Sequence, residues 1–190
     1  MSRPTGRETT EPYPLPEGDR NATTTALRPL QQRKEGDLII GKNGASAAIT
    51  LVERTSRFTT IIALPEGKDA TGVADALIEH TTELPAMMRT SLTWDQGSEM
   101  ARHAALTLAT NLKVYFADPH SPWQRPSNEN TNGLIREYIP KGEVIPAHQP
   151  YLTSIAEELN ERPRQALGFL TRRESFERLL LGQSPVASTA

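Results

Sequence analysis

The sequence contains no cysteine among its 190 residues, and this absence excludes several kinds of site. Disulfide bonds, thiol nucleophiles and zinc sites built on cysteine all need the missing side chain. The sequence also lacks an apolar run near the roughly 20 residues of a membrane-spanning helix, and its N-terminus has no hydrophobic segment of the signal-peptide type. We therefore expect a soluble cytoplasmic protein with no membrane partner.

Neither sign of charge is in excess: 21 Lys and Arg residues stand against 23 Asp and Glu residues, for a formal net charge of −2. A strongly basic surface is the usual mark of a nucleic-acid-binding domain. Its absence does not exclude such a partner, because a cluster of catalytic acids would offset basic residues elsewhere. Aromatic residues are few, at 5%, but the hydrophobic content of 36% is enough for the core of one domain.

The first 34 residues carry little signal for regular structure. They are polar and rich in threonine, and prolines interrupt them at positions 4, 12, 14, 16 and 29. Such a segment buries too little apolar surface to offset the entropy lost on ordering. We predict that residues 1–34 are a disordered or unrelated arm, that residues 35–181 form one folded domain ending in helices, and that residues 182–190 are a flexible tail.

Hydrophobic periodicity predicts an α/β domain. Strand-like segments occupy residues 37–42, 45–53, 57–64, 91–95 and 112–116. Helical segments occupy residues 69–83, 98–110, 127–138, 153–162 and 174–181. Asn43–Gly44 is a hairpin signal between the first two strands, and Met100, Ala104 and Leu108 would form the buried side of the second helix. Three antiparallel strands followed by alternating helices and parallel strands indicate a mixed sheet flanked by helices, the pattern of the ribonuclease-H-like fold.

Three acids stand where strands or helices begin or end. Asp37 lies in the apolar first strand, Asp95 follows the fourth strand, and Glu129 lies in the first turn of a predicted helix. In the proposed fold the first and fourth strands are neighbours, and the positive end of a helix dipole favours a carboxylate such as Glu129. We predict that the three side chains meet and hold divalent metal for chemistry on DNA phosphates.

Three carboxylates on separate elements suit that chemistry. Two divalent ions roughly 4 Å apart can activate an oxygen nucleophile and offset charge on a phosphodiester. Mg²⁺ prefers carboxylate oxygens and keeps several waters, and Mn²⁺ could replace it. The alternative interpretation is structural, because a sequence with 23 acids offers many such triples. Asp37 would then be a strand acid, Asp95 a turn residue and Glu129 a solvated helix acid.

Polar and basic side chains around Glu129 are candidate contacts to a DNA backbone. They are Gln124, Arg125, Asn128, Asn132, Arg136 and Lys141. Asn132 shares a helical face with Glu129, so it could instead orient a carboxylate. Helix capping and ordinary solvation remain open for each of the amides and cations.

Four segments resemble one protein family: EGDLIIGK, SLTWDQGSEM, ADPHSPWQRPSNENTNGLIREYIPKG and LNERPRQALGF. Together they closely resemble the insertion-sequence-thirty (IS-thirty) family of bacterial DDE transposases, whose core is similar to that of retroviral integrases. The resemblance covers about residues 35–180, and its most specific part is the block SPWQR…NENTNG. Carried over by position, the family's catalytic Asp, Asp and Glu fall on Asp37, Asp95 and Glu129.

The resemblance implies that residues 35–181 are an integrase-like catalytic core. It implies Mg²⁺-dependent cutting of DNA at element ends, strand transfer into target DNA, and homo-oligomers on DNA in the bacterial cytoplasm, near the nucleoid. The sequence departs from the family at Lys34, where Trp is usual, at Pro126, where Gly is usual, and in lacking an N-terminal helix-turn-helix region. We therefore expect a truncated copy.

Two other functions stay open from the sequence. The chain could be a catalytically silent remnant that still binds DNA or a full-length transposase. It could also be a ribonuclease-H-type hydrolase that cleaves without joining, although the SPWQR…NENTNG block argues against that reading.

Overall fold

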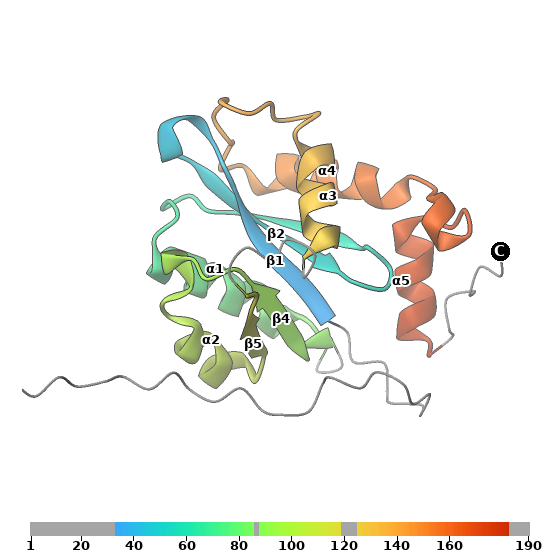
Figure 1. Ribbon diagram of the computed structural model, residues 1–190, viewed down its shortest axis with the longest axis horizontal. Helices are drawn as coiled ribbons and strands as arrows, with labels where there is room; N and C mark the ends of the chain where they lie inside the picture. Colours follow the sequence, from blue (N-terminus) through green and yellow to red (C-terminus); the bar gives the residue numbers. More distant parts are fainter. Residues whose placement is uncertain (1–32, 86–87, 119–124, 183–190) are drawn as a thin grey trace, which may run out of the picture.

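A five-stranded mixed sheet forms the centre of the domain (Figure 1). The computed structural model describes residues 33–85, 88–118 and 125–182. The strands are β1 (Arg33–Ile40), β2 (Ala47–Glu53), β3 (Thr59–Ala63), β4 (Ser91–Trp94) and β5 (Lys113–Phe116). Their order is β3-β2-β1-β4-β5, with β1–β2 and β2–β3 antiparallel and β1–β4 and β4–β5 parallel. This arrangement confirms the predicted mixed sheet and the pairing of the first strand with the fourth.

Helices cover both faces of the sheet and bury two separate cores (Figure 1). The helices are α1 (Ala70–Glu83), α2 (His103–Thr110), α3 (Pro126–Ile135), α4 (Gln149–Glu161) and α5 (Arg172–Leu180). One core joins the sheet to α1 and α2, and it includes Val73, Leu77, Trp94 and Leu106. The other joins the opposite face to α3 and α4, and it includes Ile39, Ile135, Leu152 and Leu159. No described helix is long and apolar enough to cross a membrane.

The first strand begins earlier than the sequence predicted. Arg33 and Lys34, assigned to the arm, belong to β1, where Lys34 pairs with Glu53 of β2 and Leu92 of β4. The remaining residues of the predicted arm, 1–32, and the predicted tail beyond 182 lie outside the described residues. Within β1 the alternation is as expected, because Ile39 is buried against α3 and α4 while Leu38 packs on the opposite core.

The hairpin between β1 and β2 is longer than a two-residue turn. A short 3-10 turn, Lys42–Gly44, lies between the strands, and the amide of Gly41 donates to the carbonyl of Ser46. Asn43 and Gly44 have φ angles of 53° and 70°. This left-handed backbone is the conformation that made Asn-Gly a turn signal.

The second predicted helix is divided, and its predicted buried side is wrong. Ser98–Met100 forms a 3-10 turn, and α2 begins only at His103. A 3-10 turn advances 120° per residue instead of 100°, so the two segments do not share one phase. Met100 is buried as predicted, but Leu108 is 90% exposed and Leu106 is buried in its place.

Two later helices begin before residues 127 and 153, where the sequence predicted their first residues. α3 begins at Pro126, whose fixed φ suits a first helical position, so Ser127 lies inside the helix. α4 begins at Gln149, with Pro150 in its first turn, so Thr153 is an interior residue. At α5 the side chain of Thr171 accepts from the amide of Glu174 in a capping box, which is a sequence signature that was overlooked.

Candidate functional site

Strand register places Asp37 and Asp95 at the same edge of the sheet. β1 and β4 run parallel, with Glu35 paired to Thr93. Asp37 lies two residues beyond Glu35 (37 − 35 = 2), and Asp95 lies two residues beyond Thr93 (95 − 93 = 2). Because parallel strands advance in the same direction, both carboxylates emerge just past the last paired residues.

One guanidinium group lies between these two carboxylates. Arg125 Nη1 is 3.5 Å from Asp37 Oδ1, and Arg125 Nη2 is 3.3 Å from Asp95 Oδ2. Nη1 also donates to the backbone carbonyl of Gly36, at 3.3 Å. Arg125 precedes the first residue of α3, so this helix delivers a positive charge to the point where β1 and β4 present two negative charges.

Both carboxyl groups have raised pKa values. Burial raises the pKa of Asp37 above its ordinary value; Arg125 opposes the rise, and the charge of Asp95 adds to it. Burial likewise raises the pKa of Asp95, with Arg125 opposing and the carboxylate of Glu99 reinforcing the change. Each acid is thus poorly solvated and close to another negative charge, a situation that a bound cation relieves.

An amide from α3 holds the second oxygen of Asp37. Asn132 Nδ2 donates to Asp37 Oδ2 at 3.0 Å, while Oδ1 accepts from the backbone amide of Leu38 at 2.9 Å. Asn132 was predicted either to contact DNA or to orient a carboxylate. In the structure it orients Asp37, across 95 positions of sequence.

Glu129 lies on the same helix but is not part of this cluster of contacts. It is exposed in the first turn of α3, one turn before Asn132. Within the described ranges, no group of three His, Asp or Glu side chains lies close enough to hold a metal ion. The structure therefore brings together Asp37 and Asp95 and leaves Glu129 as a predicted ligand.

Asn128 serves the fold, and its predicted role in binding DNA is wrong for this structure. Its side chain is fully buried, where Oδ1 accepts from Thr50 Oγ1 at 2.9 Å and Nδ2 donates to the Thr50 carbonyl at 3.2 Å. Its backbone amide donates to Glu35 Oε2 at 2.9 Å. These bonds fasten the first turn of α3 to β1 and β2.

Glu35 is a residue whose importance the sequence did not reveal. It is fully buried, and its carboxylate pairs with Arg54 Nε at 3.0 Å as well as accepting from Asn128. Buried acids are rare unless paired. The only sign of Glu35 in the sequence is that a charged residue stands in a strand-like segment. That sign does not distinguish a buried acid from an exposed one.

The remaining candidates for DNA contact divide by their exposure. Lys141 is exposed and free to reach a phosphate. The guanidinium of Arg136 is already bound, because Nη2 donates to the carbonyl of Ile40 at 2.8 Å and Nη1 to that of Ile139 at 3.5 Å. Gln124 lies outside the described residues.

The side chains around the two acids suit a hard divalent cation. Within the described part of the chain, Asp95 Oδ1 and Asn132 Oδ1 are buried oxygens without a hydrogen-bond partner. Mg²⁺ and Mn²⁺ bind carboxylate and amide oxygens of this kind. The cation that Asp37 and Asp95 share here is the side chain of Arg125, so a metal ion at the pair would compete with that group.

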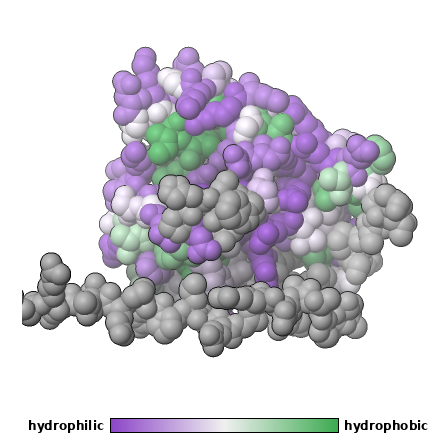
Figure 2. Space-filling model, in the orientation of Figure 1, coloured by the Kyte–Doolittle hydropathy of each residue, from purple (hydrophilic) through white to green (hydrophobic). Residues whose placement is uncertain are grey.

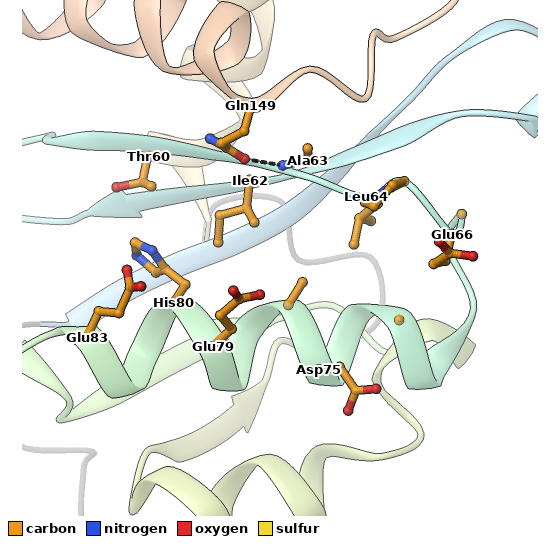
Figure 3. A pocket seen from close by; sticks show the side chains of 14 residues that line it. Thr60, Ile62, Ala63, Leu64, Glu66, Asp75, Glu79, His80, Glu83 and Gln149 are labelled. Atoms are coloured by element: carbon orange, nitrogen blue, oxygen red, sulfur yellow. Dashed lines mark hydrogen bonds between the residues drawn. The ribbon is translucent and has the colours of Figure 1, made fainter.

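A cavity of about 580 Å³ lies elsewhere, between β3 and α1, and its charge does not suit phosphate (Figure 3). Its lining includes Glu66, Asp75, Glu79 and Glu83, with His80 among them. Burial lowers the pKa of His80 to about 4, and the charge of Lys34 contributes. The imidazole therefore adds no positive charge beside these acids at pH 7, and a DNA backbone would be repelled.

Comparison with known proteins finds an integrase core family and several transposases. Residues 31–122 match the family described as integrase core domain. The chain is 50% identical over 145 residues to the Escherichia coli transposase InsI for insertion sequence element IS30A, covering 76% of this chain and 37% of that protein. It is 48% identical over 136 residues to the Cupriavidus metallidurans transposase for element IS1086, covering 71% and 40%. The chain thus spans about two fifths of the length of these relatives.

Solved structures show the same fold at low sequence identity. The catalytic core domain of BIV integrase superposes with a TM-score of 0.62 at 15% identity, over 80% of this chain and 97% of that one. A chain in the structure of the simian T-cell lymphotropic virus intasome in complex with PP2A regulatory subunit B56 gamma is also matched. Its TM-score is 0.63 at 15% identity, over 84% of this chain and 59% of the matched chain. The protein therefore has the ribonuclease-H-like fold of retroviral integrase cores, and its sequence is similar to the integrase core domain family and to the transposases of IS30-type elements.

Proposed function

We propose that this chain is the catalytic core of a transposase, a polynucleotidyl transferase that cuts DNA and joins the cut strand to a target. The observation that carries the proposal is the convergence of Asp37 and Asp95 at one edge of the sheet, where each carboxylate is desolvated. The named relatives are transposases, and they supply the reaction class.

Asp37, Asp95 and Glu129 would hold the divalent ions, Mg²⁺ or Mn²⁺. Such ions supply activation of an oxygen nucleophile and compensation of charge on the phosphorus oxygens. Asn132 keeps Asp37 oriented through Oδ2, and the bonds from Asn128 to Thr50 and Glu35 fix the helix that bears Glu129.

Arg125 has two functions in this proposal. Its guanidinium pairs with Asp37 and Asp95 and so offsets the repulsion between the two carboxylates. Its position before α3 would also let it contact a phosphate of a bound strand. Exposed Lys141 would add a contact that depends on charge and carries no sequence information.

The expected partners are the DNA of element ends and of a target site, bound by a homo-oligomer in the bacterial cytoplasm near the nucleoid. The match covers only 37% and 40% of the length of these relatives, so end recognition by the rest of such a protein belongs to the proposal as well.

A joining assay on labelled element-end DNA tests the proposed function. Purified protein with Mg²⁺ or Mn²⁺ should transfer the labelled end into a plasmid, and Asp95→Asn should abolish transfer while leaving the protein folded. Cleavage without any joined product would favour a hydrolase instead. Transfer by Asp95→Asn at the rate of the unaltered protein would overturn the assignment.

A further inference from the structure

A second cavity, of about 270 Å³, lies beside α3 and is lined by three arginines. Arg57 comes from the turn between β2 and β3, Arg164 from the loop between α4 and α5, and Arg172 from the first turn of α5. The other lining residues are Pro126, Ser127, Asn130, Thr131, Ala166 and Leu167. In Figure 1, α5 and the loop before it lie to the right of α3.

The charge in this cavity is not balanced by acids. None of the described residues that line it is a carboxylate, and none of the ion pairs in the described ranges involves its three arginines. Arg172 is 1% exposed, and burial together with the charges of Arg164, Arg57 and Arg162 lowers its pKa to about 10. Positive charges gathered at a partly buried site without a carboxylate partner repel one another, and an anion would relieve that repulsion.

Several donors in the cavity have nothing to bind. Arg172 Nε, Arg164 Nη2 and the hydroxyl of Ser127 are buried without a hydrogen-bond partner within the described residues. Ser127 is only 4% exposed. A buried donor without a partner destabilises the folded protein. The first turn of α3 adds the positive end of a helix dipole to the same space.

Arg57 also has an unfavourable backbone conformation, and such conformations are common at functional sites. Its φ angle is 63°, a left-handed conformation in which a side chain such as arginine is uncommon. The turn is fixed by the amide of Arg57, which donates to the Glu53 carbonyl, and by the hydroxyl of Thr59, which donates to the Arg57 carbonyl. Glycine would adopt this backbone conformation at lower energy. Arginine is therefore less stable here than glycine, but it places a positive charge in the lining of the cavity.

We propose that the cavity formed by Arg57, Arg164 and Arg172 binds a phosphate group of DNA. At about 270 Å³ it lies below the usual range for sites of drug-sized ligands and has room for one such group. The proposal rests on the proposed DNA function. α3 separates the two sites, since Asn132 faces Asp37 while Ser127 and Asn130 face the arginines. A phosphate fixed in the cavity would therefore set the position of the strand relative to the acids.

The test compares Arg57→Gly with Arg102→Gly, a control that removes the same charge from an exposed site at the start of α2. We expect Arg57→Gly to be at least as stable as the unaltered protein, because glycine accepts the left-handed backbone. Its affinity for a DNA duplex, measured by fluorescence anisotropy, should fall about 3- to 10-fold, and the slope of log K against log salt should fall by about one. Arg102→Gly should change the affinity less than about two-fold.

Inorganic phosphate provides an arm that does not depend on catalysis. Phosphate should raise the melting temperature more than chloride at equal ionic strength, and Arg57→Gly or Arg164→Gln should remove most of that difference. Phosphate stabilisation with DNA affinity unchanged in Arg57→Gly would mean a site for free phosphate and overturn the DNA assignment. Equal phosphate stabilisation in all variants would overturn the cavity as an anion site. Asp95→Asn should retain the effect, so failure of strand transfer and failure of this proposal are distinguishable.

Discussion

At the scale of single residues, the most informative contact is that of Arg125 with Asp37 and Asp95. Each pair is partly buried, with the arginine side chain 18% exposed and the two aspartates 27% and 42% exposed. The contact explains how two desolvated carboxylates can lie close together. It could not be predicted from the sequence, because the arginine and the acids are 88 and 30 positions apart (125 − 37 = 88; 125 − 95 = 30).

Arg125→Gln should change metal affinity and stability in opposite directions. Without the guanidinium, Mn²⁺ no longer competes with a resident cation, so affinity measured by calorimetry should rise about five-fold, the equivalent of about 1 kcal/mol. The metal-free protein should lose about 1 kcal/mol of unfolding free energy. Arg125→Lys keeps a cation and is the control. Weaker Mn²⁺ binding in Arg125→Gln than in the unaltered protein would show that the arginine assists the metal.

At the scale of elements, α3 is the part that joins the fold to the site. Its first turn is bound to Thr50 and Glu35 through Asn128, and its second turn reaches Asp37 through Asn132. Its apolar contact is small, with Ile135 fully buried and Leu134 only partly so. Buried hydrogen bonds therefore decide where the helix lies.

Asn128→Ala should lower the unfolding free energy by about 2–4 kcal/mol, because it removes both bonds that a fully buried side chain makes to Thr50. Asn130→Ala, on the exposed side of the same helix, should cost less than about 0.5 kcal/mol. Urea unfolding of the two variants measures the difference. Equal stability of the two would mean that α3 is held by something other than Asn128.

The sequence predicted the helices and strands whose bounds follow from local hydrophobic pattern. It did not predict the bounds that depend on contacts with the rest of the fold. The strands and α1 follow the periodicity, and Asp69 caps α1 by accepting from the amides of Thr71 and Gly72. The break before α2 leaves Leu108 exposed at 90%, against the pattern. Propensity does not reveal such a break, because a 3-10 turn and an α-helical turn accept the same residues.

At the scale of the whole molecule, the two cavities have opposite charge. The cavity between β3 and α1 is lined by acids, whereas the cavity beside α3 is lined by arginines. The near-zero net charge of the chain hides this separation, and the sequence offered no way to detect it. Figure 2 shows that hydrophilic side chains extend over much of the face that carries α3.

The acid-lined cavity also predicts how stability depends on pH. The pKa of His80 is about 4 in the folded protein against an ordinary value of 6.5, because burial disfavours the charged ring. The unfolded chain therefore binds the proton first as pH falls. The contribution of the neutral ring is complete above pH 6.5 and is lost as pH falls from 6.5 to about 4.

Between pH 7 and pH 4.5, the unaltered protein should thus lose about 2 kcal/mol more unfolding free energy than His80→Gln. Urea unfolding at both pH values measures this difference. His148→Gln, at an exposed position before α4, should behave as the unaltered protein does. A His80→Gln variant with unchanged acid sensitivity would show that other groups control it.

The candidate site was predictable from the sequence only in part. Asp37 and Asp95 could be placed together because strand order follows from the element pattern, and register then aligns them. The environment of each side chain could not be predicted, so buried Asn128 was mistaken for a DNA contact and Glu35 was overlooked. The role of Glu129 as a metal ligand remains a prediction. Its place on α3 puts it on the same helix as Asn132, but its side chain makes no contact with the two aspartates in the described residues.

Calorimetric titration with Mn²⁺ tests the central claim most directly. The protein should bind the ion, and Asp37→Asn, Asp95→Asn and Glu129→Gln should each weaken binding at least about ten-fold. Glu137→Gln, which alters an exposed acid just beyond α3, should bind as the unaltered protein does. If all three variants kept the affinity of the unaltered protein, these carboxylates would not be its metal ligands.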